Sequence, residues 1–291
     1  MVSVSPRYAI LGAGNIGSAL IGGLLKAGVA IPEQITATVR TPEHAGELAE
    51  QFNIRVLPSG NLAAVDNADV IILAVKPSVM PQVLQEIRWA LRDGRILISL
   101  AAAFPIPLIE HLTGRRMPVF RAMPNIPCVV GAGATGIAYN SLATAEHITF
   151  VERIFAAVGV VSFVEEDLLH AVTALAGSGP AYIYMIIEAL IAGGLKQGLS
   201  HEVATRLAEQ TVLGAAKLVK ETGIHPAVLR DQVITPGGVT ISAIHELEAH
   251  GLRSMLISAI ETATEHSRTV TDKMILSAQG PAQDTKGGPN R

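Results

Sequence analysis

The sequence predicts an α/β domain built on a parallel sheet, followed by an all-helical domain. In the first half, short apolar runs alternate with segments of helical periodicity, as expected for a sheet covered by helices on both faces. From Glu165 onward only helical periodicity remains. The length of 291 residues also suits two domains. We therefore expect one domain over residues 1–164, a helical domain over 165–278 and a polar tail over 279–291.

The strands of the first half are predicted from short runs that are rich in apolar residues. The expected strands are Arg7–Leu11, Ile35–Arg40, Asp69–Val75, Arg95–Leu100 and Pro118–Ala122, with short pieces at Gly136–Ala138 and Val160–Val164. The expected helices between them are Asn15–Ala27, Pro42–Gln51 and Val79–Leu91. Continuous apolar strands belong to sheets that are buried on both faces, so the sheet should be parallel and doubly wound.

The second half shows helical spacing interrupted by capping residues. The expected helices are Asp167–Leu175, Pro180–Lys196, Ser200–Lys220, Pro226–Val233, Thr240–Glu248 and Leu252–Lys273. Ser200 suits a helix N-cap, and Gly223 and Gly251 stand where C-terminal glycines belong. The apolar stretch Ala181–Leu195 is shorter than the ~20 residues of a membrane span and contains Glu188, which favours a buried core helix.

Composition argues against several classes of function. The formal net charge is -3 and no basic block occurs, so nucleic-acid binding is not expected. The single cysteine, Cys128, leaves no internal disulfide and no multi-thiolate metal site, as in a reducing compartment. The first residues lack the charged segment and cleavage site of a signal peptide. We expect a cytoplasmic protein without a bound metal.

A glycine-rich turn follows the first predicted strand. Gly12, Gly14 and Gly17 form a G-x-G-x-x-G pattern that opens a helix at Asn15 and Ile16. In this context the first glycine makes the turn, the second admits a pyrophosphate and the third lets helix and strand pack closely. The helix N-terminus offers unpaired N–H groups to the phosphates. The alternative is a turn that serves packing alone. We expect a Rossmann-type domain in which these five residues bind a dinucleotide.

The end of the second predicted strand indicates which dinucleotide is bound. An acidic residue there would bond the adenosine ribose of NAD, but the segment TATVRT contains Arg40 and Thr41 instead. A guanidinium and a hydroxyl suit a 2′-phosphate, so NADPH is favoured and NADH remains possible. The alternative is that Arg40 is only a solvated surface charge.

Several longer motifs resemble the Δ1-pyrroline-5-carboxylate reductase family. In the helical half these are ALAGSGPAYIYMIIEAL, LAEQTVLGAAKL and HPAVLRDQVITPGGVTISAIHELE. In the first half GAGNIG, LAVKP, SLAAA and RAMPNIP occur in the family's order. The resemblance covers residues 8–278. It implies hydride transfer from NADPH or NADH to the C=N bond of pyrroline-5-carboxylate, giving L-proline in the last step of proline synthesis. It also implies that the helical domain interlocks with its twin in a homodimer, which in this family often assembles further, commonly into a decamer.

The resemblance assigns the Pro-Gly-Gly turn to the substrate carboxylate. Thr235, Gly237, Gly238 and Val239 would bind it, because backbone N–H groups at a helix start attract anions and glycines leave room for a ligand. The Thr240 hydroxyl would bond the ring nitrogen, which makes it the expected catalytic residue. The alternative is a simple interhelical turn in which Thr240 caps the next helix.

Further cofactor and substrate residues follow from the same match. Ser178 of the GSGP segment is a substrate candidate. Lys76 invites a catalytic interpretation, but in the family the backbone of this segment holds the nicotinamide half of the cofactor. The remaining expected cofactor residues are Asn61, Ala74, Val75, Lys76, Pro77, Ala101, Ala102, Met123, Pro124 and Asn125.

Two other functions stay open at this point. One is a reductase of another cyclic imine, or an electron-transfer relative with a different acceptor. The other is a protein that senses the cofactor and has lost catalysis. The histidines suggest no metal chemistry, since His245 and His250 are five residues apart and point ~140° away from each other on a helix.

Overall fold

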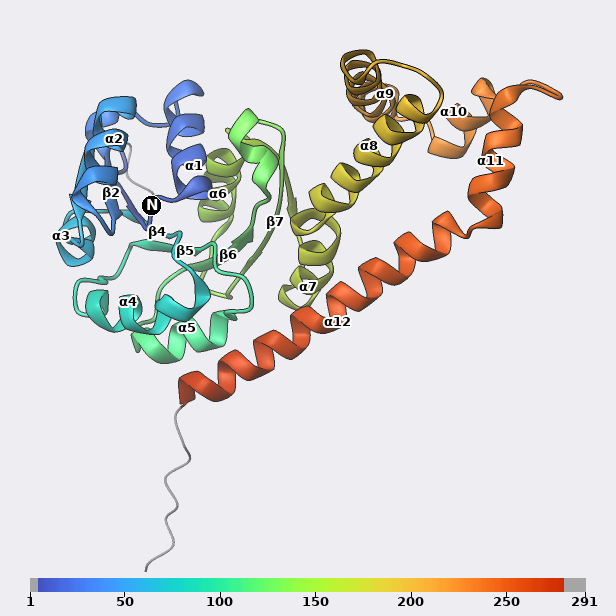
Figure 1. The fold of residues 1–291 in the computed structure, drawn as a ribbon. Coiled ribbons are helices and arrows are strands. Elements are labelled where there is room, and N and C mark those ends of the chain that lie inside the picture. The colour runs from blue at the N-terminus through green and yellow to red at the C-terminus, as the bar shows by residue number, and fades with distance from the viewer. Residues whose placement is uncertain (1–4, 280–291) are drawn as a thin grey trace, which may run out of the picture. The chain divides into compact units, whose positions relative to one another are not determined.

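The computed structural model describes residues 5–279, and Figure 1 shows its fold. The predicted tail therefore lies, beyond Gln279, outside the described residues. The chain forms two compact units: the first runs to Gly177 and resumes at Ala263, and the second spans Ser178–Thr262. The first unit extends past residue 164 because Leu169, His170 and Ala174 are buried in it.

The first unit contains one sheet of eight strands in the order β3-β2-β1-β4-β5-β6-β7-β8. The strands are β1 (Tyr8–Leu11), β2 (Ile35–Val39), β3 (Arg55–Pro58), β4 (Val70–Leu73), β5 (Ile96–Ser99), β6 (Val119–Met123), β7 (Gly133–Tyr139) and β8 (Gly159–Phe163). Strands β1 to β6 pair in parallel, in the strand order of a Rossmann domain. The prediction of a Rossmann-type α/β domain followed by helices is confirmed.

The last two strands depart from the predicted parallel arrangement. Strand β7 runs antiparallel to β6, and β8 is parallel to β7. The link from β6 to β7 contains only a short 3-10 turn, Ile126–Val130. A parallel crossover needs a dozen or more residues, so this link returns the chain in the opposite direction.

Helices cover both faces of this sheet, as Figure 1 shows. The helices are α1 (Asn15–Lys26), α2 (Pro42–Phe52), α3 (Asn61–Asp66), α4 (Met80–Ile87), α5 (Ile106–Thr113) and α6 (Ala145–Ala156). Alternate residues of β1 serve different faces: Tyr8 and Ile10 pack with α1, α2 and α6, whereas Ala9 and Leu11 pack with α3, α4 and α5. Met274 and Ile275 pack against the second of these layers.

A segment of mixed helix type leads out of the first unit. The predicted helix Asp167–Leu175 consists of a 3-10 turn at Glu166–Leu168, α7 (Leu169–Val172) and a π-helix at Thr173–Gly177. Gly136 faces this segment, and a Cβ added there would lie 2.6 Å from Val172. A short π-helical stretch of this kind often occurs beside a functional site.

The second unit consists of α8 (Gly179–Lys196), α9 (His201–Thr222), α10 (Pro226–Val233), α11 (Val239–Ala249) and the first part of α12 (Leu252–Gln279). Helices α8 and α9 pack against each other where Gly194 meets Ala204. Within this unit, Ala204 and Ala208 are the only fully buried residues.

The large apolar side chains of the second unit are mostly exposed. Met185 of α8 is 68% exposed and Leu207 of α9 is 55% exposed. The expectation that Ala181–Leu195 is a buried core helix is therefore wrong for the single chain, since within residues 5–279 the packing of α9 leaves most of this helix uncovered. One helical stretch, Glu166–Lys196, is long and apolar enough to cross a membrane by length and composition, and 6% of its most apolar window is buried.

Candidate cofactor and substrate sites

The glycine turn after β1 has the geometry expected of a dinucleotide site. Gly12 has a φ of +85°, and a Cβ added there would lie 2.5 Å from Val75 Cγ1. Its N–H donates to the Thr38 carbonyl at 3.0 Å, as does that of Ala13 at 2.9 Å. Only glycine takes this conformation readily in so tight a space. The turn is thereby fixed against the ends of β2 and β4.

The second glycine leaves a space open in front of α1. A Cβ added at Gly14 would meet no atom within 4 Å, whereas one at Gly17 would lie 3.3 Å from the Gly12 carbonyl oxygen. Gly14 is the N-cap of α1, and no side chain caps the helix there. The N–H groups of Asn15 and Ile16 have no carbonyl one turn earlier in the helix to accept from them, so they can bind an anion. The conformation and spacing of the three glycines suit the predicted roles, and pyrophosphate binding at this turn stays a prediction.

Arg40 follows β2 with its side chain exposed and without an ion pair among the described residues. Thr41 is the N-cap of α2, and its hydroxyl accepts from the His44 N–H at 3.4 Å. His44 Nε2 lies 3.2 Å from the Ala13 carbonyl, which joins α2 to the glycine turn. A free guanidinium beside a helix N-terminus suits a phosphate.

Asn61 takes part in a hydrogen-bond chain that the sequence did not indicate. The Thr38 hydroxyl accepts from the Gly12 N–H at 3.2 Å and donates to Asn61 Oδ1 at 2.7 Å. Asn61 Nδ2 donates to Glu86 at 2.8 Å. The amide therefore connects β2, α3 and α4 behind the turn. Its role beside a cofactor phosphate stays a prediction.

The remaining predicted cofactor residues follow neighbouring parallel strands. Ala74–Pro77 follow β4, Ala101 and Ala102 follow β5, and Met123–Asn125 end and follow β6. The sheet therefore brings all three segments to its carboxyl edge, where ligands of such folds bind. The Lys76 side chain is exposed, at the start of the 3-10 turn Pro77–Val79.

Asn125 has a structural role at this edge. Its Nδ2 donates to the Ala176 carbonyl at 3.0 Å, and its Oδ1 accepts from the Ala134 N–H at 2.8 Å. The side chain is thus occupied in joining β6 to β7 and to the π-helix. A contact between Asn125 and a cofactor stays a prediction.

The Pro-Gly-Gly turn lies in the second unit and begins α11. Gly237 has a φ of +67°, and the Gly238 N–H donates to the Thr235 carbonyl at 3.0 Å. A Cβ added at Gly238 would overlap the Thr235 hydroxyl. Gly238 is the N-cap of α11 and has no side-chain cap, so the alternative of Thr240 as N-cap is wrong.

This arrangement leaves unpaired donors at the start of α11. The N–H groups of Val239, Thr240 and Ile241 have no carbonyl one turn earlier in the helix to accept from them. The Val239 side chain is 88% exposed. Ser178 is likewise the N-cap of α8 and makes no capping hydrogen bond. Ser178 and the N–H groups at the start of α11 are therefore each available to a ligand.

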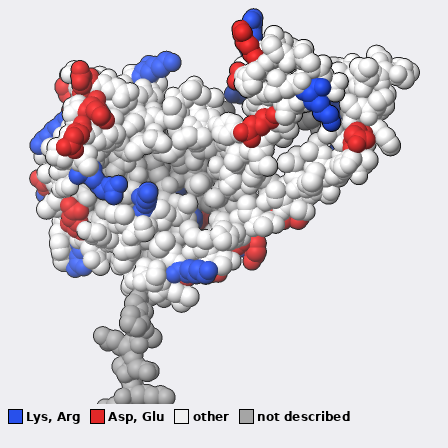
Figure 2. Space-filling model, in the orientation of Figure 1, with Lys and Arg blue, Asp and Glu red and all other residues white. Residues whose placement is uncertain are grey.

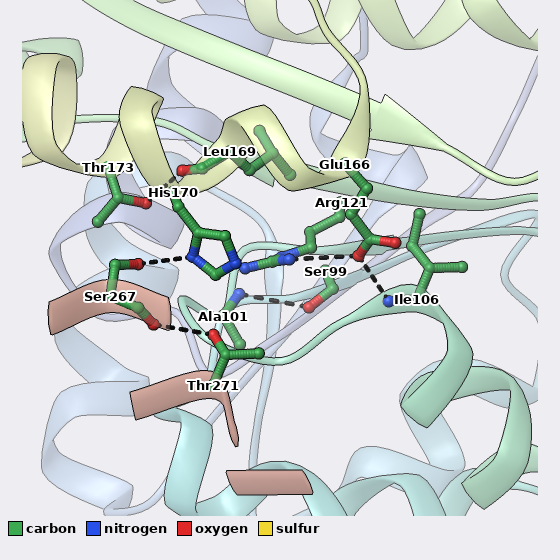
Figure 3. A network of polar contacts seen from close by, with 10 residues as sticks. All are labelled: Ser99, Ala101, Ile106, Arg121, Glu166, Leu169, His170, Thr173, Ser267 and Thr271. Carbon is green, nitrogen blue, oxygen red and sulfur yellow. Dashed lines mark hydrogen bonds and ion pairs between the residues drawn. The ribbon is translucent and has the colours of Figure 1, made fainter. Parts of the chain in front are cut away.

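A buried ion pair stands near the predicted cofactor segments and was not expected from the sequence. Arg121 Nη1 donates to Glu166 Oε1 at 3.2 Å, and the same oxygen accepts from the Ile106 N–H at 2.7 Å (Figure 3). Burial lowers the pKa of Arg121 despite the opposing effect of Glu166. The pair joins β6, α5 and the Glu166–Leu168 turn.

His170 extends the same network toward α12. Its Nδ1 lies 2.9 Å from the Ser267 hydroxyl, as Figure 3 shows. Burial lowers the pKa of His170, and the charge of Arg121 lowers it further. In residues 5–279 no group of three or more His, Cys, Asp or Glu side chains is placed to hold a metal ion.

Two family models match the two halves of the chain. One is described as pyrroline-5-carboxylate reductase dimerisation and matches residues 166–270. The other is described as NADP oxidoreductase, coenzyme F420-dependent, and matches residues 7–103. Among curated relatives, the pyrroline-5-carboxylate reductase of Methanosarcina acetivorans is 40% identical over 267 residues, which is 92% of this chain and 98% of the relative. The chain belongs to the pyrroline-5-carboxylate reductase family.

Other members agree in sequence and fold. The pyrroline-5-carboxylate reductase of Escherichia coli strain K12 is 37% identical over 91% of this chain and 98% of its own length. The solved reductase of Coxiella burnetii superposes with a TM-score of 0.87 at 37% identity, covering 91% of this chain and 98% of that one. The structure of Plasmodium falciparum pyrroline carboxylate reductase with NADP bound superposes with a TM-score of 0.82 at 29% identity, with the same coverage of both chains.

Proposed function

We propose that this chain reduces 1-pyrroline-5-carboxylate to L-proline with NAD(P)H, the final step of proline biosynthesis. The observation that carries the proposal is the intact glycine turn, with open space at Gly14, in a chain similar over nine-tenths of its length to reductases of this name. The reaction is an oxidoreduction of a C=N bond. It needs a bound dinucleotide, a carboxylate site and a proton for the ring nitrogen.

The residues of the first unit fit a dinucleotide. The pyrophosphate would lie against Gly14 and the N–H groups of Asn15 and Ile16, where no side chain intervenes. Arg40 would pair with a 2′-phosphate, which favours NADPH over NADH. The segments after β4, β5 and β6 would hold the nicotinamide half. The nicotinamide ring supplies the hydride when bound, and the protein supplies position.

The residues of the second unit fit a small carboxylate. The N–H groups at the start of α11, with the glycines before them, would accept the carboxylate without obstruction by side chains. Thr240, in the first turn, would donate its hydroxyl hydrogen bond to the ring nitrogen and hold the substrate for protonation. Ser178 would contact the substrate from the N-terminus of α8. Lys76 contributes its backbone rather than its ammonium group.

The assembly follows from the apolar surface of the second unit. Its helices expose Met185, Leu207 and other large side chains that a second copy of the chain would cover. In Figure 2 uncharged surface separates the charged residues of this unit on the face in view. We propose a homodimer that assembles further, in the manner of a decamer, in the cytoplasm. Neither a membrane nor a nucleic acid is a partner in this proposal.

The test is oxidation of NADPH, and separately of NADH, when pyrroline-5-carboxylate is added to the purified protein. We expect turnover with both cofactors and a higher kcat/KM with NADPH. Turnover with a different cyclic imine, but none with pyrroline-5-carboxylate, would indicate a reductase of that other imine. NADPH binding without turnover on any imine would indicate a cofactor-sensing protein.

A further inference from the structure

A pocket with a volume of about 430 Å³ lies in the first unit, apart from the predicted cofactor and substrate residues. It is formed by residues of α5, β6, the Glu166–Leu168 turn, α7 and the last part of α12. None of the predicted cofactor or substrate residues lines it. Its size falls in the range of small-molecule sites. The polar network in Figure 3 forms one of its walls.

Arg121 brings unfilled hydrogen-bond donors to this pocket. Its side chain is 5% exposed, and of its five N–H donors only one, on Nη1, has an acceptor among the described residues, Glu166. The fully enclosed polar side-chain atoms without a partner in the described part of the chain are the Tyr8 hydroxyl and Thr135 Oγ1. The other guanidinium donors are therefore not fully enclosed, and Arg121 is one of the residues that line the pocket. Such a buried, preorganised fork suits a carboxylate.

Two acidic residues stand at the rim of the same pocket. Asp167 and Asp272 are exposed, and neither forms an ion pair within residues 5–279. The charges of Glu166 and Arg121 cancel. Asp167 and Asp272 therefore give the lining a net negative charge when its histidines are neutral. The lining also contains apolar side chains, among them Leu108 and Ile275.

We propose that this pocket binds a small cationic α-amino acid, with its carboxylate on Arg121 and its ammonium groups facing Asp167 and Asp272. A phosphate or a dicarboxylate would meet the two rim acids, which repel it. A neutral apolar ligand would leave the arginine donors unfilled. A cation without a carboxylate would do the same. The chemistry of the walls thus selects a molecule that carries both signs of charge on an aliphatic body.

The bound amino acid would stabilise the first unit. Glu166 fixes Arg121 to the start of α5, and His170 fixes the neighbouring turn to Ser267 of α12. The ligand adds contacts between these elements, and a ligand that binds only the folded state raises the temperature of unfolding. This inference does not depend on the reductase activity.

The test uses L-lysine as the probe, with isothermal titration calorimetry on the full chain saturated with NADPH. We expect one site per chain, and binding about tenfold weaker for 1,5-diaminopentane, which lacks the carboxylate, and for L-norleucine, which lacks the terminal ammonium group. L-Glutamate should not bind. These comparisons probe Arg121 without mutating a buried residue.

Matched variants locate the site. Asp167→Asn and Asp272→Asn should each weaken L-lysine binding by about threefold or more, whereas Asp93→Asn, an exposed acid remote in sequence, should not. Thr240→Ala should leave L-lysine binding unchanged, because that residue belongs to the proposed substrate site. Absence of binding by L-lysine at millimolar concentration, wild-type affinity for L-lysine in both rim variants, or loss of binding in Thr240→Ala would overturn the proposal. Reductase activity measured on the same samples reports the proposed function separately.

Discussion

The replacement Gly14→Ala separates the stability of the glycine turn from its capacity to bind a cofactor. Gly14 has φ -79° and ψ -157°, a conformation that alanine adopts, and its Cβ would meet no atom within 4 Å. Alanine restricts the unfolded chain, which stabilises by about 0.4–1 kcal/mol. It is a poorer N-cap than glycine by about the same amount. The free energy of unfolding should therefore change by less than about 1 kcal/mol.

Cofactor binding should respond much more strongly to the same change. The added methyl group would occupy the space in which the pyrophosphate approaches the N–H groups of α1. Losing one hydrogen bond to a charged group costs about 1.5–3 kcal/mol, which weakens binding by roughly 10- to 100-fold. Fluorescence titration with NADPH measures the affinity, and urea denaturation of the same samples measures the stability.

Two further glycines serve as controls. Gly12→Ala should destabilise the fold by more than about 1–2 kcal/mol, because it combines a φ of +85° with a Cβ 2.5 Å from Val75. Gly46→Ala, an exposed site inside α2 with open space around it, should stabilise by about 0.5–1 kcal/mol and leave NADPH binding unchanged. Wild-type affinity for NADPH in Gly14→Ala would refute the assignment of the pyrophosphate to this turn.

Three other predictions follow from the same geometry. Arg40→Ala should lower kcat/KM for NADPH by about tenfold and leave that for NADH unchanged; equal losses would contradict the 2′-phosphate role. Thr240→Ala should lower kcat at least about tenfold without changing the KM for NADPH, and Thr240→Ser should restore it; full activity in the alanine variant would exclude the hydroxyl. Because the pKa of His170 is lowered in the fold, the unfolded chain binds more protons below about pH 6.5, so stability should fall with acid there. His170→Gln should reduce this dependence in urea denaturation at several pH values, although His147, whose pKa is also lowered, will retain part of it.

Local sequence patterns were sufficient for the elements with strong periodicity. The strands β1, β4 and β5 are buried at every position, as their largely apolar sequences indicate, and α9 begins after Ser200 and ends at Gly223 as expected. The geometry of the glycine turn was also predictable, because it depends on neighbours within one strand–turn–helix unit. The geometry of the Pro-Gly-Gly turn was predictable for the same reason, because it also depends on neighbouring residues in the sequence.

Elements without a clear local signal were not predicted. Strand β3 is short, half-exposed and ends in Pro58, and α3 has only six residues. Helix α5 begins beside Pro105 and Pro107, and prolines are more typical of loops, so no helix was predicted there. Helix α6 did carry a signal, since Thr144 is its N-cap with a capping box to His147. That pattern could have been recognised.

The polar contacts that shape the site are distant in sequence. Arg121 and Glu166 are 45 residues apart, and Thr38 and Asn61 are 23 apart. No periodicity indicates such pairs, because they depend on the order in which strands enter the sheet. The exposure of α8 was not predicted either. The sequence of an apolar helix shows the same periodicity whether its own chain or a second copy covers the helix.

The most direct test of the account is the amount of L-proline formed for each NADPH oxidised when pyrroline-5-carboxylate is supplied. Chiral chromatography of the product and absorbance of the cofactor give the two quantities. The account predicts one L-proline for each NADPH consumed, at a rate that falls in Gly14→Ala and in Thr240→Ala. NADPH oxidation without proline, or proline formation that both variants leave unchanged, would contradict it.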